Sequence, residues 1–502
     1  MKGIAYQEEF GPGGSTTSSK VKYIDPLADV KSCKRDVPLL AELRTNTIRT
    51  YAIDPEADHD ECMEMLDKAG IYVIADLSEP NLSINREDPL WDVDLFDRYK
   101  KVIDSLAKYS NVIGFFAGNE VSNDATNTEA SAFVKAAVRD TKKHIRDNHE
   151  RWMGVGYAAN DDDQIRVNIA HYFNCGDQDD AIDYWGYNIY SWCGKSSISA
   201  SGFDKQADFF RNYSVPVFFA EYGCNKVGNT ESSDIRTWED TLALYSDEMT
   251  DVFSGGIVYM YHEEDNTYGL VDIREGGAKK LKNFSALKTQ IAKVDPSSTA
   301  MEDYSPTNSP QACPDVAEKW QVNAAAMPPT PDSDLCECMY DSLTCVPDDS
   351  TAKKAYGDMF NYVCEEDANA CAGIKADVAA GVYGPYGMCN AKQKLGYVLD
   401  QFYKNQNSQA FACDFEGQAK ILSSPKGPAA SCSPKLQSAS KAAEKAATAT
   451  VADPADNEPA VTPSSSSFAS PMRAGQMPAV FDYAIGAYAV VAMAVGGAMV
   501  ML

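Results

Sequence analysis

Two glutamates, each at the end of a short apolar run, are the residues of this sequence best placed for catalysis. Glu120 follows the run 115–119, and Glu221 follows the run 217–220. Carboxylates at the C-terminal ends of parallel barrel strands are where TIM-barrel enzymes hold their catalytic groups. One glutamate after a strand more often forms a loop salt bridge or caps a helix. Two of them in this arrangement indicate an acid/base and a nucleophile that cleave a glycosidic bond.

A retaining reaction of this kind needs two carboxyl groups about 5–5.5 Å apart. One is protonated and gives its proton to the leaving oxygen, while the other is ionised and attacks the anomeric carbon. Asn119 immediately precedes Glu120. Its amide is therefore expected to hold the sugar 2-hydroxyl, where hydrogen bonds strengthen in the transition state.

Polar and aromatic residues also stand at the ends of the other predicted strands. A tyrosine at such a position often only packs in the core with its hydroxyl satisfied. Their shared position instead predicts a groove for sugar faces and hydroxyls around a barrel mouth. These residues are Gln7, Tyr51, Asp76, Tyr190, Tyr259 and Tyr268.

The elements that must position these groups follow from the hydrophobic pattern of the first three hundred residues, which alternates between strands and helices. Strands are predicted at 3–6, 47–51, 71–76, 112–117, 153–156, 184–189, 217–220 and 256–260. Helices are predicted around 62–69, 95–109, 129–147 and 237–252. Eight strands with intervening helices indicate a (β/α)8 barrel in the α/β class. A doubly wound open sheet is the alternative, but no glycine-rich phosphate loop follows the first strand.

Composition limits the rest of the chain. A length of 502 residues predicts two or more domains, and 44% hydrophobic residues allow a large core. The net charge of −28 argues against a nucleic acid or an anionic membrane surface as a partner. Of the 14 cysteines, nine lie between Cys313 and Cys432, which indicates a disulfide framework in an oxidising compartment. No metal site is expected, because the chain has only five histidines.

Four regions follow from these shifts in composition, and the C-terminal segment described below is a fifth. We expect a catalytic barrel at 1–300, a linker at 301–332, and a small, mainly helical, disulfide-rich domain at 333–432. A disordered stalk rich in Ser, Ala and Pro is expected at 433–472. Three sequons would accept N-glycans if the chain is secreted, and they begin at Asn81, Asn212 and Asn283.

The two ends of the chain carry different signals. No basic-then-apolar leader precedes the first predicted strand, so a leader is either removed or lies upstream of this start. Residues 484–502 form an apolar run of 19 residues, preceded by small residues and a short spacer. The segment 473–502 is therefore expected to be a GPI-attachment signal. A spanning or tail-anchored helix is the alternative, although Arg473 is the only basic residue close by.

Motifs along the chain resemble the fungal β-1,3-glucanosyltransferases of glycoside hydrolase family 72. In family order these motifs are the stretches 3–7, 48–51, 71–77, 116–121, 188–194, 221–225, 254–259 and 266–271. The cysteine-rich segment looks like the β-1,3-glucan-binding module that one subgroup carries after its barrel, and the tail looks like the family's GPI signal. Ala220 departs from the serine that many members have before the nucleophile, and the missing leader is a second departure.

The resemblance implies that Glu120 is the acid/base, that Glu221 is the nucleophile, and that Asn119 and the six strand-end residues line the sugar subsites. It also implies three disulfides: Cys33 with Cys62, Cys193 with Cys224, and Cys175 with Cys313. The expected reaction cleaves β-1,3-glucan internally and transfers the new reducing end to another chain, with glucan donor and acceptor as partners and no cofactor. A monomer at the outer face of the plasma membrane or in the cell wall is expected. A hydrolase with the same glutamates and a non-catalytic glucan-binding wall protein are the alternatives.

Overall fold

A closed barrel of eight parallel strands forms the first part of the chain in the computed structural model, which describes residues 1–8, 23–227, 230–231, 236–274, 276–423 and 431–449. Neighbours around the barrel follow the order β1-β10-β7-β6-β5-β4-β3-β2. The strands are β1 Lys2–Ala5, β2 Thr47–Thr50, β3 Tyr72–Asp76, β4 Val112–Asn119, β5 Gly154–Ala159, β6 Tyr184–Ile189, β7 Val217–Tyr222 and β10 Phe253–Val258. The (β/α)8 prediction is confirmed, and the open-sheet alternative is excluded by closure between β1 and β2.

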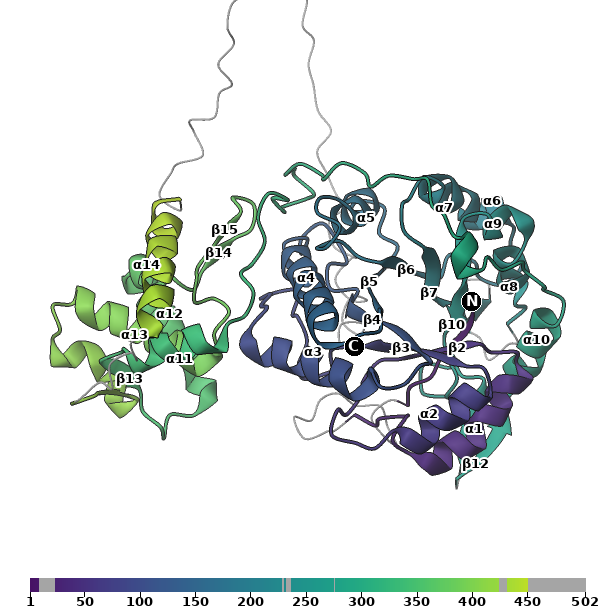
Figure 1. The fold of residues 1–502 in the computed structure, drawn as a ribbon, viewed down its shortest axis with the longest axis horizontal. Coiled ribbons are helices and arrows are strands. Elements are labelled where there is room, and N and C mark those ends of the chain that lie inside the picture. Colours follow the sequence, from purple (N-terminus) through teal and green to yellow (C-terminus); the bar gives the residue numbers. More distant parts are fainter. Residues whose placement is uncertain (9–22, 228–229, 232–235, 275, 424–430, 450–502) are drawn as a thin grey trace, which may run out of the picture. The chain divides into compact units, whose positions relative to one another are not determined.

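Helices surround the strands (Figure 1). They are α1 Val30–Glu42, α2 Asp60–Lys68, α3 Val93–Leu106, α4 Ala130–Asn148, α5 Arg166–Asn174, α6 Ile198–Ser201, α7 Phe203–Phe210, α8 Glu239–Leu244, α9 Asp247–Thr250 and α10 Lys282–Ile291. The prediction of a single helix at 237–252 is wrong. Helix α8 ends before Tyr245, and a second helix, α9, begins after Ser246, whose backbone is extended. Helix α1 was not predicted because it contains Pro38. Helix α5 was not predicted because it is buried around much of its surface, so its sequence shows no apolar stripe.

The barrel core has two layers. Strand and helix side chains pack between the barrel and its outer helices, while Phe116, Phe218, Ile257 and other side chains fill the barrel interior. The Tyr184 ring lies across β4 and β5, and its hydroxyl donates to the Phe115 carbonyl (2.6 Å). A Cβ on Gly156 would lie 2.2 Å from this ring, so glycine is required there for the close approach. Two short hairpins project from the barrel: β8 Lys226–Val227 with β9 Thr230–Glu231, and β11 Val271–Arg274 with β12 Gly277–Lys280.

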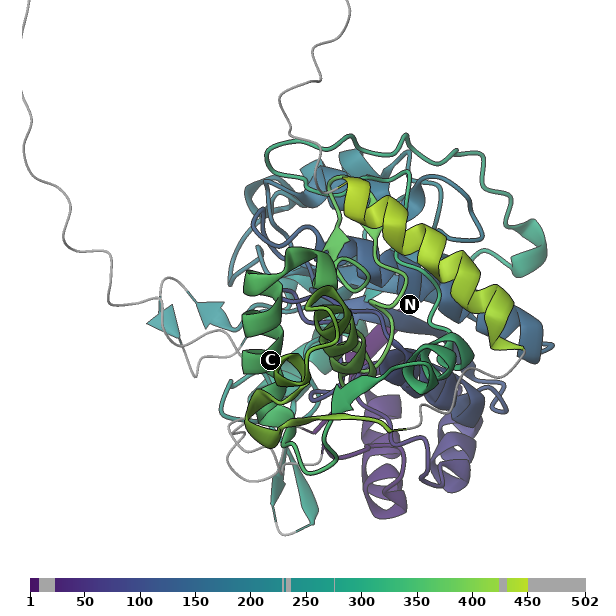
Figure 2. The same cartoon turned by 90° about the vertical axis from the view of Figure 1, so that its left-hand side faces the viewer.

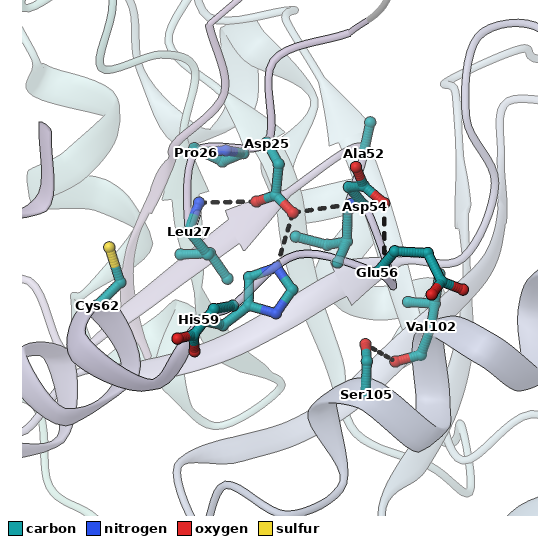
Figure 3. Close-up of polar contacts among 12 residues, drawn as sticks. Asp25, Pro26, Leu27, Ala52, Asp54, Glu56, His59, Cys62, Val102 and Ser105 are labelled. Carbon is teal, nitrogen blue, oxygen red and sulfur yellow. Dashed lines mark hydrogen bonds and ion pairs between the residues drawn. The ribbon is translucent and has the colours of Figure 1, made fainter. Parts of the chain in front are cut away.

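A buried carboxylate ties the segment after residue 22 to the loop that follows β2. Asp25 accepts hydrogen bonds from the backbone N–H groups of Leu27 and Asp54 (2.8 Å each), and its Oδ2 contacts the ring of His59 (2.8 Å; Figure 3). Asp25 and His59 are both buried. This network fixes one rim of the barrel at the end that carries the catalytic candidates.

The C-terminal domain is a small helical unit held by disulfides, as predicted. Its main helices are α11 Ser333–Asp341, α12 Tyr356–Glu366 and α13 Ala391–Asn405, and a capping box between Asn390 and Gln393 begins α13. Two-stranded sheets join β13 Cys345–Pro347 to β16 Ala419–Ile421 and β14 Ala376–Asp377 to β15 Val382–Tyr383. The disulfides here are Cys336–Cys389, Cys338–Cys432, Cys345–Cys413 and Cys364–Cys371.

Three further disulfides staple the barrel region, and they are the pairs that the resemblance implied. Cys33–Cys62 joins α1 to α2, and Cys193–Cys224 joins the segments that follow β6 and β7. Cys175–Cys313 ties the end of α5 to the segment that leaves the barrel. All cysteines of the chain are therefore paired.

Two segments differ from what composition suggested. Within 301–332, Trp320 is fully buried in the barrel's main hydrophobic cluster, so this part of the expected linker is packed. The first part of the expected disordered stalk is helix α14 Cys432–Ala449, drawn yellow-green in Figure 2. Alanine favours a helix, Cys432 anchors its start, and Ala439 is buried, so the prediction of disorder from residue 433 is wrong.

The rest of the stalk and the expected GPI signal at 473–502 lie outside the described residues. Within the described part of the chain, no helix combines the length and apolar character that a membrane crossing requires.

Candidate active site

Glu120 and Glu221 lie at the same end of the barrel, the first just after β4 and the second near the end of β7. Glu120 directly follows β4 with a φ of 48°, a left-handed backbone conformation that is uncommon for a non-glycine residue and typical of functional sites. Its N–H donates to the Ala158 carbonyl (2.8 Å), and its own carbonyl accepts from Arg86 (2.7 Å). Glu221 lies inside β7, because that strand continues to Tyr222, so the prediction that it follows the strand is wrong by two residues.

Three donors converge on the Glu221 carboxylate. The hydroxyl of Tyr51 donates to Oε1 and that of Tyr190 to Oε2, each at 2.8 Å. Arg49 Nη1 lies 3.3 Å from Oε1. Glu221 is only 7% exposed, so these contacts are screened little by solvent.

Arg49 organises the floor of the site, although the sequence reasoning did not single it out. It is fully buried, and its guanidinium is bidentate to Asp76, with Nε–Oδ1 at 2.9 Å and Nη2–Oδ2 at 2.8 Å. The guanidinium also lies over the rings of Tyr51 and Phe116, 4.4 and 4.5 Å from their centroids. The available signal was an arginine within a strand of a closed barrel, since such a residue requires a buried acidic partner.

A relay of amides links Arg49 to Glu120. Asn119 Oδ1 accepts from Arg49 Nη2 and from Asn188 Nδ2, both at 3.0 Å. Asn188 Nδ2 also donates to Glu120 Oε1 (2.7 Å). With its carbonyl held by two donors, Asn119 leaves its NH2 group as the end that can meet a sugar hydroxyl. Asn188 is a second residue that the sequence reasoning missed, because it lies inside β6.

Burial and neighbouring charges oppose each other at Glu221. Burial raises the pKa of Glu221 to about 7, and the charge of Glu120 adds to the rise. The Arg49 guanidinium and the hydroxyls of Tyr190 and Tyr51 lower the same pKa. Burial also raises the pKa of Asp76, against the pull of Arg49. The donors therefore offset only part of the cost of burial, since the pKa of each carboxyl group stays above its ordinary value.

Four tyrosine rings form an aromatic wall beside Glu221: Tyr51, Tyr190, Tyr259 and Tyr268. Tyr259 lies edge-on to Tyr51 and Tyr190, with centroids 6.5 and 6.4 Å away. Tyr268 lies 5.3 Å from Tyr259 and 5.8 Å from Tyr190. All four rings are partly exposed. The structure therefore gathers four of the six expected strand-end residues into one surface next to the carboxylate.

Gln7 and Asp76 occupy different places from the wall. The Gln7 amide forms hydrogen bonds with backbone groups. Its Oε1 accepts from the N–H groups of Tyr51 (3.0 Å) and Ala52 (3.1 Å), and its Nε2 donates to the Ile24 carbonyl (2.6 Å). Gln7 is 8% exposed. In this structure it fixes the backbone of Tyr51, and Asp76 fixes Arg49.

The described residues of this site form no group of three metal ligands. The one group of that kind found in the described residues is Asp104, His144 and His149, on the outer helices, where both histidine Nε2 atoms contact Asp104 Oδ1 at 2.7 and 2.8 Å. The sequon asparagines Asn81 and Asn212 are exposed, whereas Asn283 is partly buried and its Oδ1 accepts from the Arg236 N–H (2.9 Å).

Comparison with known proteins covers both parts of the chain. A sequence model described as "Glucanosyltransferase" matches residues 1–295, and one described as "X8 domain" matches residues 343–420. A 1,3-beta-glucanosyltransferase of Arthroderma benhamiae is 54% identical over 435 residues, which are 86% of this chain and 78% of that protein. The 1,3-beta-glucanosyltransferase gas1 of Schizosaccharomyces pombe is 43% identical over 84% of this chain and 76% of its own length.

Solved structures of Saccharomyces cerevisiae Gas2p have the same fold. Gas2p in complex with laminaritriose and laminaritetraose is 42% identical, with a TM-score of 0.75 over 84% of this chain and 92% of that one. A glutamate-to-glutamine variant of Gas2p in complex with laminaritetraose and laminaripentaose gives a TM-score of 0.76 at 40% identity, over 88% and 94% of the two chains.

Proposed function

The chain belongs to the glucanosyltransferase family, glycoside hydrolase family 72, and is a 1,3-β-glucanosyltransferase that elongates β-1,3-glucan, and we propose that Glu120 is its acid/base and Glu221 its nucleophile. The difference in donors between the two carboxyl groups carries this assignment. Glu221 receives two tyrosine hydroxyls and the Arg49 guanidinium, whereas Glu120 receives Asn188 Nδ2.

Two interacting carboxyl groups that share one proton titrate as a pair. At Glu221 burial and the charge of Glu120 favour the protonated form, whereas the Arg49 guanidinium and the hydroxyls of Tyr190 and Tyr51 favour the carboxylate. The donors at Glu221 stabilise the carboxylate that attacks C1, and we assign to Glu120 the proton that goes to the glycosidic oxygen. The reverse assignment would make the carboxyl group that accepts from Arg49, Tyr51 and Tyr190 the proton donor.

The two steps follow from these positions. The Glu120 proton moves to the glycosidic oxygen as the C1–O bond breaks, and a Glu221 oxygen forms a bond to C1. The amide of Asn119 meets the 2-hydroxyl, where the hydrogen bond strengthens as positive charge develops at C1. In the second step Glu120 takes the proton of an acceptor hydroxyl as that oxygen displaces Glu221 from C1. The retained configuration is the result of two displacements.

The substrate is β-1,3-glucan, and the tyrosine wall is the proposed acceptor surface. Gas2p structures hold laminari-oligosaccharides, and aromatic faces pack against the apolar faces of sugar rings. An acceptor sugar lying on Tyr259 and Tyr268 would displace water beside the covalent intermediate. Transfer is then favoured over hydrolysis because the competing nucleophile is excluded.

The test is incubation with a β-1,3-gluco-oligosaccharide of a single length whose reducing end has been reduced, followed by mass analysis of the products. Products longer than the input are expected from the wild type, and Glu120→Gln and Glu221→Gln are expected to lose turnover. Products that are only shorter would make the protein a hydrolase. Wild-type activity in either variant would refute the assignment of the two glutamates.

We propose that the X8 domain binds β-1,3-glucan through exposed aromatic side chains. Phe411 is 70% exposed and Tyr362 52% exposed, and the Tyr362 ring lies 5.9 Å from Phe415. In the Glu221→Gln background, Tyr362→Ala and Phe411→Ala should release the full chain from insoluble β-1,3-glucan. Tyr304→Ala, at a tyrosine with the same 52% exposure, is the control and should leave retention unchanged.

A cell-surface location agrees with seven disulfides, which persist in oxidising compartments. We propose that residues 473–502 direct GPI attachment, that the chain is a monomer, and that Asn81 and Asn212 accept N-glycans. Release of the protein from cells by a phosphatidylinositol-specific phospholipase C would support the anchor. Retention after that treatment, with loss on detergent extraction, would indicate a spanning helix instead.

A further inference from the structure

We propose that Arg236 is a positioning residue for glucanosyl transfer: it fixes the acceptor-facing tyrosines Tyr259 and Tyr268 by binding their backbone carbonyls. This inference rests on the acceptor role proposed above for the tyrosine wall. Arg236 lies in the segment before α8, on none of the barrel strands, and its side chain is 3% exposed.

The guanidinium joins the ends of two barrel strands and the segment that follows the second of them. Nη1 donates to the carbonyl oxygens of Gly223 (3.1 Å) and Tyr259 (2.9 Å), and Nη2 donates to that of Tyr268. Gly223 directly follows β7, which carries Glu221, and Tyr259 directly follows β10. Arg236 thus holds the strand end beside the nucleophile to both tyrosines.

The position of Arg236 is itself well determined. Its guanidinium lies over the Trp238 ring, 4.1 Å from the centroid, and 5.8 Å from the centroid of Tyr268. Trp238 has a φ of 55°, a strained conformation for a large residue, and its Nε1 donates to the Asn283 carbonyl (3.1 Å). Asn283 Oδ1 accepts from the Arg236 N–H as well. The surrounding contacts therefore hold the cation in one place.

Motion of the two carbonyls would reach the nucleophile through the aromatic wall. Tyr259 and Tyr268 contact Tyr190, and Tyr259 also contacts Tyr51. The hydroxyls of Tyr190 and Tyr51 hold the Glu221 carboxylate. Release of the guanidinium would first displace the two outer rings, where the acceptor binds, and would affect the inner pair only secondarily. The expected defect is therefore in transfer more than in cleavage.

Burial lowers the pKa of Arg236 to about 10, with the charges of Asp240 and Glu263 opposing that effect, so the side chain is a cation at neutral pH. Charge-assisted hydrogen bonds to carbonyl oxygens are stronger than neutral ones. A lysine keeps the charge but has no planar fork and cannot serve three carbonyls in this arrangement. Arg236→Lys should therefore be intermediate between the wild type and Arg236→Met.

The chain offers a matched control in Arg98. This arginine is also buried, and its guanidinium also serves backbone carbonyls, those of Ile53 (2.6 Å) and Leu77 (3.3 Å). It also donates to the Tyr23 hydroxyl (3.0 Å). Its contacts hold the loops after β2 and β3 and include neither Tyr259 nor Tyr268. Arg98→Lys therefore removes the same kind of interaction from a different part of the rim, after β2 and β3.

The experiment uses the full chain and an end-reduced β-1,3-gluco-oligosaccharide, and measures the rate of cleavage and the ratio of transfer to hydrolysis products over a range of acceptor concentrations. Arg236→Lys and Arg236→Met should lower that ratio by at least about fivefold and raise the acceptor concentration for half-maximal transfer, with a smaller change in cleavage rate. Arg98→Lys should lower the Tm while leaving the ratio at the wild-type value.

An unchanged product ratio in Arg236→Lys, together with a lower Tm, would make Arg236 a structural residue and would overturn the proposal. Equal losses of cleavage and transfer would also overturn it. If Arg236→Met does not fold, Arg236→Lys decides alone, since lysine keeps the positive charge and is no larger than arginine. Failure of the acceptor role of the tyrosine wall would be visible separately, as an unchanged ratio of transfer to hydrolysis in Tyr259→Ala and Tyr268→Ala.

Discussion

Substitution of Tyr190 by phenylalanine should move the acid limb of the pH profile of kcat/KM to higher pH. The Tyr190 hydroxyl donates to Glu221 Oε2 at 2.8 Å, and this bond favours the ionised carboxylate and lowers its pKa. Activity falls on the acid side when Glu221 takes up a proton and can no longer attack C1. Removal of the donor makes that protonation easier, so the loss of activity begins at a higher pH.

The size of the shift follows from the strength of the bond. A hydrogen bond to a charged group contributes about 1.5–3 kcal/mol, and one pKa unit corresponds to about 1.4 kcal/mol. Phenylalanine keeps the ring and its contacts with Tyr259 and Tyr268, so the wall remains. We expect a shift of about one to two pH units, with a kcat/KM near that of the wild type on the alkaline side of the limb.

The assay is initial-rate cleavage of an end-reduced β-1,3-gluco-oligosaccharide between about pH 3 and 9, with kcat/KM fitted for each variant. Tyr213→Phe is the control, because that hydroxyl donates to the Ala170 carbonyl (2.6 Å) and has no contact with Glu221. Its acid limb should coincide with that of the wild type. An acid limb that stays in place in Tyr190→Phe, or moves to lower pH, would refute the reasoning about Glu221.

Three further outcomes are expected. Arg49→Met leaves Asp76 buried without its guanidinium, so the free energy of unfolding should fall by about 3–5 kcal/mol in urea titration; a loss below about 1 kcal/mol would contradict the pairing. Because the pKa of Glu221 rises from 4.5 to about 7 on folding, the native state is progressively destabilised between these pH values, by about 3 kcal/mol in all, and Glu221→Gln should lose that pH dependence. Replacement of Cys175 and Cys313 by serine opens a loop with a sequence separation of 138 residues and should cost about 2–5 kcal/mol, with faster proteolysis within 301–332; unchanged cleavage there would argue against a staple.

The barrel was predictable because its strands are apolar runs of the right length in alternation with helices. Glu120 and Glu221 stood out as charged residues at the ends of such runs, and the structure brings them to the same rim. Arg49 and Asn188 were not predicted, because both lie inside strands, where a single polar residue reads as an interruption of the core. Only the closed sheet shows that Arg49 lies beside Asp76 and Glu221.

Side-chain direction set a second limit on prediction. Gln7 stands at a strand end like the tyrosines, but its amide turns to the backbone of Tyr51, since a buried amide needs partners. Helix α14 shows a third limit. A segment rich in Ala and Ser has a composition that fits both a disordered stalk and a helix. Here the Cys338–Cys432 disulfide and the burial of Ala439 favour the helix.

The assignment of Glu221 as nucleophile is tested most directly by trapping the covalent intermediate. Glu120→Gln is incubated with a β-laminari-oligosaccharyl fluoride, whose leaving group departs without a general acid, while the loss of the base slows the second step. The account predicts that the protein gains the mass of one laminari-oligosaccharyl group, which peptide mapping locates on Glu221. A label on another residue, or hydrolysis of the fluoride to a sugar of inverted configuration with no label, would contradict it.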